Sequence, residues 1–102
     1  MKTIEQRVTS GINWLNKVKP GWEKRIHVKV FNIANCHKCV CGQIFGNFGN
    51  VMLGSYGTAK KGDKFAMSKN QACNRGFFDT HNNYDALQKE WLKRFKELKI
   101  KI

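Results

Sequence analysis

The chain has 102 residues, of which 41% are hydrophobic and 25% are charged, a composition typical of a globular protein with one modest core. It contains no run of about 18 apolar residues, so no membrane-spanning helix is predicted. Nineteen basic and seven acidic residues give a net charge of +12, which favours a polyanionic partner, nucleic acid or an acidic protein. We expect a single domain over residues 1–102, with no membrane partner and no evident small-molecule substrate.

The N-terminal segment predicts an amphipathic helix over residues 3–18. Thr3 and Gln6 have the spacing of a capping box at its start, and Pro20-Gly21 marks its end. The segment 22–26 is predicted to add one further turn. Apolar side chains recur at the three- and four-residue spacings of one helical face, and they are Ile4, Val8, Ile12, Leu15 and Val18.

The middle of the chain is less regular. The weak alternation of residues 27–31 predicts a short strand or an extended link. Asn35 is a good N-cap for a second helix over 36–45, and Gly46-Asn47 predicts the end of that helix. The glycine-rich stretch 46–62 predicts a loop or a loose hairpin.

The last third of the chain predicts two more helices. One covers residues 64–75, and the other begins at Asn83 or Asp85 and carries a Glu90–Arg94 pair four residues apart. The C-terminal helix has a continuous apolar stripe, made by Tyr84, Leu87, Trp91, Phe95 and Leu98. The predicted fold is therefore mostly α, a single small domain of three to four helices. A short two-stranded β element is predicted from residues 26–31 and 51–56.

Three of the four cysteines and one histidine lie within residues 36–41. Cys36 and Cys39 have the Cys-x2-Cys spacing of a zinc knuckle, and Cys73 with His81 can supply a second pair of ligands. The glycine that usually follows the second cysteine of a knuckle is missing, and the second pair is not compact. Zinc therefore stays open as a cofactor, although no cofactor is the favoured prediction.

The favoured alternative treats the same cysteines as core residues of the helix predicted over 36–45. Free cysteine packs like a small hydrophobic side chain and is among the most buried residue types. Gly42 and Gly46, four residues apart, would let another backbone segment come close. A cysteine nucleophile would need a positioned base, and His37 points away from Cys36 on a helix. We therefore predict no catalytic residues.

One octapeptide carries a resemblance. Residues 39–46 read Cys-Val-Cys-Gly-Gln-Ile-Phe-Gly, which resembles the motif Cys-Val-Leu-Gly-Gln-x-Phe-Gly of small uncharacterised proteins from phages and prophages. Similar pieces are Trp22 to Ile26, Gly76-Phe77 and the Leu87…Trp91 helix. That pattern has leucine where Cys41 stands, which implies that Cys41 fills a core position. The resemblance implies a phage context and a small accessory role, with no activity to carry over.

The basic residues fall into three groups along the chain. If the groups converge, they can line a phosphate backbone, and Trp14, Phe48 and Tyr56 can stack on bases if they are exposed. The residues predicted to bind nucleic acid or another partner are Lys17, Lys19, Lys24, Arg25, Lys60, Lys61, Lys64, Lys89, Lys93 and Lys96.

The sequence as a whole predicts a non-catalytic, small basic protein of phage type that binds nucleic acid or a nucleoprotein. Two alternatives stay open: an inhibitor that binds an acidic patch of a host defence or nucleic-acid-processing enzyme, and a structural zinc module. The N-terminus lacks the apolar stretch of a signal peptide. We therefore expect a cytoplasmic location, which is the host cytoplasm if a phage encodes the protein.

Overall fold

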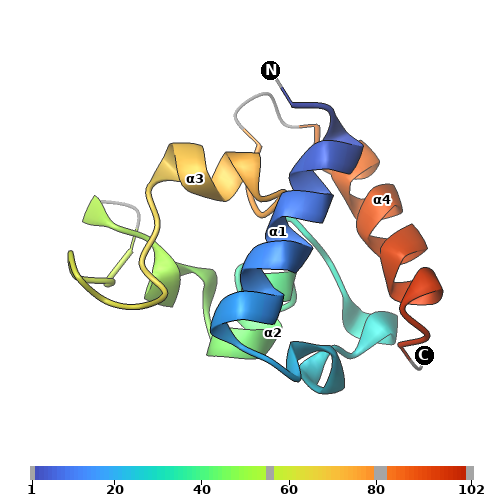
Figure 1. Ribbon diagram of the computed structural model, residues 1–102, viewed down its shortest axis with the longest axis horizontal. Coiled ribbons are helices and arrows are strands. Elements are labelled where there is room, and N and C mark those ends of the chain that lie inside the picture. The colour runs from blue at the N-terminus through green and yellow to red at the C-terminus, as the bar shows by residue number, and fades with distance from the viewer. Residues whose placement is uncertain (1, 55–56, 80–82, 101–102) are drawn as a thin grey trace.

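The computed structural model describes residues 2–54, 57–79 and 83–100, which form four α-helices and three short 3-10 helices (Figure 1). The α-helices are α1 (Ile4–Val18), α2 (Val40–Phe45), α3 (Lys69–Asn74) and α4 (Tyr84–Glu97). The 3-10 helices are η1 (Trp22–Arg25), η2 (Val28–Val30) and η3 (Phe48–Val51). The predicted mostly α fold and the predicted turn at 22–26 are confirmed.

Helix α1 runs through the middle of the molecule, with α4 on one side and α3 on the other (Figure 1). Its capping box is confirmed: the Gln6 N–H donates to Thr3 Oγ1 at 3.1 Å, and the Thr3 N–H donates to Gln6 Oε1 at 2.9 Å. Gly11 lets α1 approach the end of α3, because a Cβ at this position would lie 2.1 Å from the carbonyl oxygen of Arg75.

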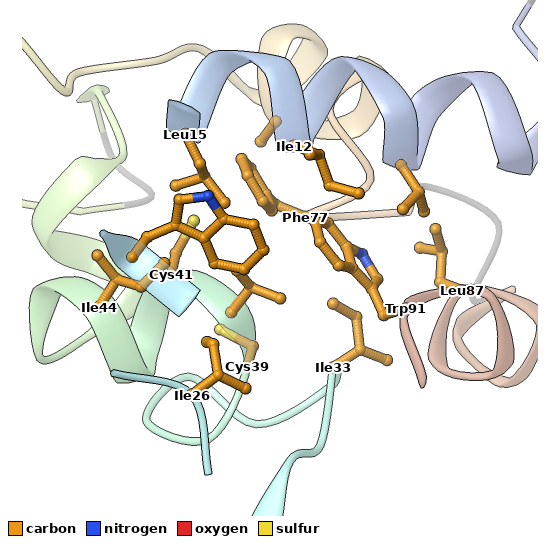
Figure 2. Close-up of a cluster of buried hydrophobic side chains, with 14 of the residues drawn as sticks. Ile12, Leu15, Ile26, Ile33, Cys39, Cys41, Ile44, Phe77, Leu87 and Trp91 are labelled. Atoms are coloured by element: carbon orange, nitrogen blue, oxygen red, sulfur yellow. The ribbon is translucent and has the colours of Figure 1, made fainter. Parts of the chain in front are cut away.

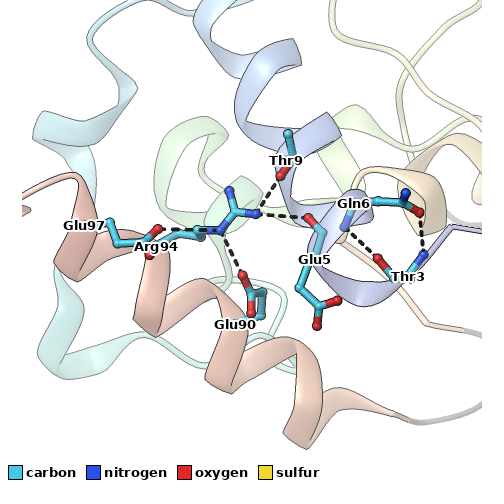
Figure 3. Close-up of polar contacts among 7 residues, drawn as sticks. All are labelled: Thr3, Glu5, Gln6, Thr9, Glu90, Arg94 and Glu97. Carbon is cyan, nitrogen blue, oxygen red and sulfur yellow. Dashed lines mark hydrogen bonds and ion pairs between the residues drawn. The ribbon is translucent and has the colours of Figure 1, made fainter.

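Arg94 connects α4 to α1 (Figure 3). Its Nε donates to Glu90 Oε2 at 2.8 Å, which confirms the predicted pair. Its Nη2 donates to the carbonyl oxygen of Glu5 at 3.1 Å and to Thr9 Oγ1 at 2.6 Å. One guanidinium therefore completes a pair within α4 and fixes the position of α4 against α1.

The predicted apolar faces of the two long helices meet in one core (Figure 2). Leu98 departs from the prediction, since it lies just beyond α4 and is 43% exposed. The Trp91 indole N–H donates to the carbonyl oxygen of Gly76 at 2.8 Å, so this large side chain is buried without an unpaired donor. The buried members of the two faces are Val8, Ile12 and Leu15 on α1 and Leu87, Trp91 and Phe95 on α4.

The strand predicted over residues 27–31 is wrong, because this segment forms η2 with bonds between residues three apart. Side-chain amides bind the flanking backbone where a partner strand would do so. Gln43 Oε1 accepts the His27 N–H at 2.6 Å, and Gln88 Nε2 donates to the carbonyl oxygen of Phe31 at 3.0 Å. Because these side-chain amides satisfy backbone groups that would otherwise bond to a partner strand, the segment needs no partner strand.

The helix predicted over residues 64–75 is wrong in its first part, since α3 begins only at Lys69. Ser68 and Gln71 form a capping box there, with the Gln71 N–H donating to Ser68 Oγ at 3.2 Å. Met67, just before the cap, lies in an isolated β-bridge. A residue in extended conformation and a strong cap therefore shorten the helix.

The predicted two-stranded β element is also wrong in the described part of the chain. Two isolated parallel bridges take its place, one between Met52 and Met67 and one between Leu53 and Ala59. Residues 55–56 of the predicted strand lie outside the described residues. Apart from η3 and the bridge residues, the described part of the stretch 46–62 contains no α-helix and no strand, in agreement with the predicted loop.

Candidate functional site

The cysteine-rich segment is not the single helix predicted over 36–45. Asn35, the predicted N-cap, closes a separate turn, since its Oδ1 accepts the backbone N–H groups two and three residues later at 2.9 and 3.1 Å. Helix α2 begins at Val40, and its N-cap is Cys39, whose Sγ accepts the N–H of Gly42 at 3.2 Å. Helix α2 ends with Gly46 as its C-cap, so the predicted end of the helix is confirmed.

Cys39 and Cys41 belong to the hydrophobic core, as predicted for small apolar residues (Figure 2). Burial raises the pKa of the Cys39 thiol to about 11 and raises the pKa of Cys41 well above its usual value. Both thiols therefore keep their proton near neutral pH. A thiol must lose this proton before it can act as a nucleophile or bind a metal ion.

The predicted zinc ligands occupy different environments. Cys36 is exposed, Cys39 is buried and Cys73 is half-buried on α3. In the part of the chain that the structure describes, no group of three or more Cys, His, Asp or Glu is placed to hold a metal ion. His81 lies outside the described residues, so the zinc site as a whole stays a prediction.

Thiol titration checks the assignment of the cysteines. At about pH 8, we expect an aromatic disulfide reagent to label Cys36 rapidly, because it is exposed. Cys39 and Cys41 should react only after denaturant is added. The Cys36→Ser variant is the control and should lose the fast phase. Fast labelling of Cys39 or Cys41 in that folded variant, located by mass spectrometry, would contradict their assignment to the core.

The arginines serve mainly internal contacts. Arg7 is buried, donates from Nε to the carbonyl oxygen of Cys73 at 2.7 Å, and pairs through Nη2 with Asp79 Oδ1 at 3.3 Å. Arg94 is bound between α1 and α4 as described above. The Arg75 guanidinium lies 4.7 Å from the centroid of the Trp14 ring. Of the four arginines, Arg25 is therefore the one that the structure leaves exposed.

The exposed positive charge consists mainly of lysine. Lys19 is half-buried, and it meets Lys64 at the ring of Phe65, with Nζ-to-centroid distances of 5.9 and 5.7 Å. The loop that carries Lys64 and α4 lie at opposite ends of the molecule, so the three predicted groups do not form one patch (Figure 1). The other predicted residues are all exposed: Lys17, Lys24, Arg25, Lys60, Lys61, Lys64, Lys89, Lys93 and Lys96.

One groove gathers basic side chains from two segments, and we call it the basic groove. It has a volume of about 580 Å³, and none of the described acidic residues lines it. The sequence predicted two of its cations but missed the others, since nothing local indicates that residues 24–27 face residues 37–38. The basic side chains that line it are Lys24, Arg25, His27, His37 and Lys38.

Helix α2 holds the two walls of the basic groove together. Gln43 accepts the His27 N–H on one wall and donates from Nε2 to the carbonyl oxygen of Lys38 on the other, at 2.6 and 2.9 Å. Gly42 lets the second wall lie directly against the helix, because a Cβ there would be 2.4 Å from the carbonyl oxygen of Cys36. Gly42 and Gln43, which belong to the octapeptide, therefore hold the two walls of the basic groove in place.

The aromatic residues predicted to stack on bases have other neighbours. Trp14 is half-buried and packs edge-on against Phe77, with ring centroids 5.8 Å apart. Phe48 is half-buried and stacks on Phe78 at 6.4 Å. Tyr56 lies outside the described residues. Trp14 and Phe48 are therefore only partly exposed, and each already packs against another aromatic ring.

Among the described helices, none is long and apolar enough to cross a membrane. Comparison with protein-family models, with curated proteins and with solved structures found no match. The residues and their arrangement are therefore the basis for the functional inference.

Proposed function

We propose that this protein is a non-catalytic accessory protein of phage type that binds nucleic acid, free or within a nucleoprotein, through its exposed lysines. The observation that carries this proposal is the distribution of charge. Buried Asp79 and Glu90 are each neutralised by an arginine, so the net charge of +12 is carried by the other residues, and most of the described lysines are exposed. Binding a phosphate backbone with such a surface releases condensed counterions.

The exposed side chains are suited to contacts with the phosphate backbone of a nucleic acid and not to recognition of its base sequence. Lysine is a flexible point charge, whereas arginine forms the bidentate contacts that recognise guanine. The lysines are exposed and three of the four arginines are engaged internally. We therefore expect similar affinity for different sequences, and the resemblance of residues 39–46 to small phage proteins supports the accessory role.

Salt dependence tests the proposal. In fluorescence anisotropy with a labelled duplex, we expect the affinity to fall by about 10³-fold or more between about 50 and about 200 mM salt, as for six or more phosphate contacts. A duplex of equal length and different sequence is the control and should bind equally well. No binding to duplex or single-stranded DNA or RNA at about 50 mM salt would overturn the proposal.

A pull-down with and without nuclease identifies the class of partner. Proteins captured through nucleic acid should disappear after nuclease treatment. One host protein that remains in stoichiometric amount after this treatment would instead favour the inhibitor alternative, with an acidic surface on the host protein as the complement of the lysines.

A further inference from the structure

We infer that the basic groove is the principal phosphate-binding site of this protein and receives the phosphodiester backbone of a nucleic acid. This inference rests on the proposed function and adds to it a location. It separates Lys24, Arg25 and Lys38, which line the groove, from the lysines of α4, which do not.

The basic groove gathers charge of one sign. Three cationic side chains and two imidazoles line one open, shallow depression, without a described carboxylate among its lining residues. A concave surface lined by one sign of charge focuses the electric field and concentrates counter-ions. The lysines of α4 lie on the exposed face of this helix instead, where a charge is largely solvated and screened.

The walls of the basic groove are preorganised. The backbone of both walls is fixed by Gln43 and by the tight contact of Gly42. His37 is also held, with Nδ1 3.1 Å from the carbonyl oxygen of Gly46. A site whose supporting groups are already hydrogen-bonded loses little conformational freedom when an anion binds.

The lining of the basic groove is suited to the backbone of a nucleic acid more than to its bases. Its described residues include no Phe, Tyr or Trp, its only rings are the imidazoles of His27 and His37, and its apolar member Val30 is 51% exposed. Bases therefore find no large aromatic surface there on which to stack. Cationic and N–H groups are suited to phosphate oxygens, and such contacts position a protein on nucleic acid without reading sequence.

Two charge-matched double variants test the location of the site. The groove variant is Lys24→Gln with Lys38→Gln, and the control is Lys89→Gln with Lys93→Gln. All four lysines are exposed, so both variants should fold, which circular dichroism and thermal melting would verify. If the groove binds phosphate, its variant should lower the slope of log affinity against log salt by about 2 and the low-salt affinity by about tenfold or more.

The result for the control decides the interpretation. A small effect of the control beside a large effect of the groove variant supports the inference. Equal effects of the two variants on duplex binding would overturn it and leave the proposed function intact. If the unmodified protein binds no nucleic acid, the proposed function fails, and inorganic polyphosphate becomes the probe. Selective loss of polyphosphate binding in the groove variant would then support a phosphate site, whereas equal loss or no binding would overturn it.

Discussion

Replacing Asp79 by asparagine is expected to lower the free energy of unfolding by about 3–5 kcal/mol, because it leaves a buried guanidinium without its counter-charge. The side chains of Arg7 and Asp79 are only 10% and 4% exposed, and Nη2 lies 3.3 Å from Oδ1. The other oxygen of Asp79 accepts the N–H of Asn83, the residue that precedes α4. The substitution therefore disturbs the contact between Arg7 on α1 and residue 79, and it also disturbs the start of α4. Urea unfolding followed by circular dichroism measures the loss.

Two further variants make this expectation specific. Asp85→Asn removes an exposed carboxylate from the first turn of α4 and should cost about 1 kcal/mol or less, the range of a helix-dipole contact. The double replacement Arg7→Met with Asp79→Leu removes both charges and should be less destabilising than Asp79→Asn alone. A loss for Asp79→Asn no larger than that of Asp85→Asn would contradict the structural importance of the pair.

The two long helices could be predicted because their signals are local. The apolar stripes of α1 and α4 repeat at helical spacing, and Thr3 with Gln6 supplies a cap that needs no distant residue. Such amphipathic faces have one stable solution, which is burial against each other. The Glu90–Arg94 pair followed from the same periodicity, although its extension to Thr9 on α1 required the tertiary structure.

The middle of the chain could not be predicted in the same way, because competing local contacts and distant amides decide its structure. Asn35 can cap a helix or close a turn, and here it closes a turn. The segment 27–31 alternates like a strand, but Gln43 and Gln88 bind the backbone that a strand would pair. Isolated side-chain amides that take the place of a partner strand leave no periodic pattern in the sequence.

The basic groove was beyond prediction for a related reason. Lys24 and Arg25 were identified as candidates from charge alone, whereas Lys38 and His37 lay in a segment that indicated metal or core. Their approach depends on the bond between His27 and Gln43, which are 16 residues apart. The proposed class of partner therefore comes from the charge composition, whereas the proposed location of the site could come only from the tertiary structure.

Replacing Gly42 by alanine is expected to destabilise the protein by about 2–3 kcal/mol, the upper range for inserting a group into a packed site. The opposite sign would be expected from helix propensity, which favours alanine over glycine by about 1 kcal/mol. Gly42 lies within α2, and an added Cβ would be 2.4 Å from the carbonyl oxygen of Cys36 and 2.6 Å from the carbonyl carbon of His37. Both neighbours are backbone atoms and cannot rotate away. Thermal and urea unfolding therefore reveal directly which effect is larger.

The same variant should also weaken nucleic-acid binding, because the backbone that must move carries His37 and Lys38, which form one wall of the basic groove. Gly62→Ala is the matched control. Gly62 has a φ of +99° with open space around it, in a loop remote from the groove, so alanine there introduces backbone strain of about 1–2 kcal/mol but should leave binding unchanged. A Gly42→Ala protein that is as stable as the unmodified chain would mean that this backbone moves aside easily. The walls of the basic groove would then be neither rigid nor preorganised.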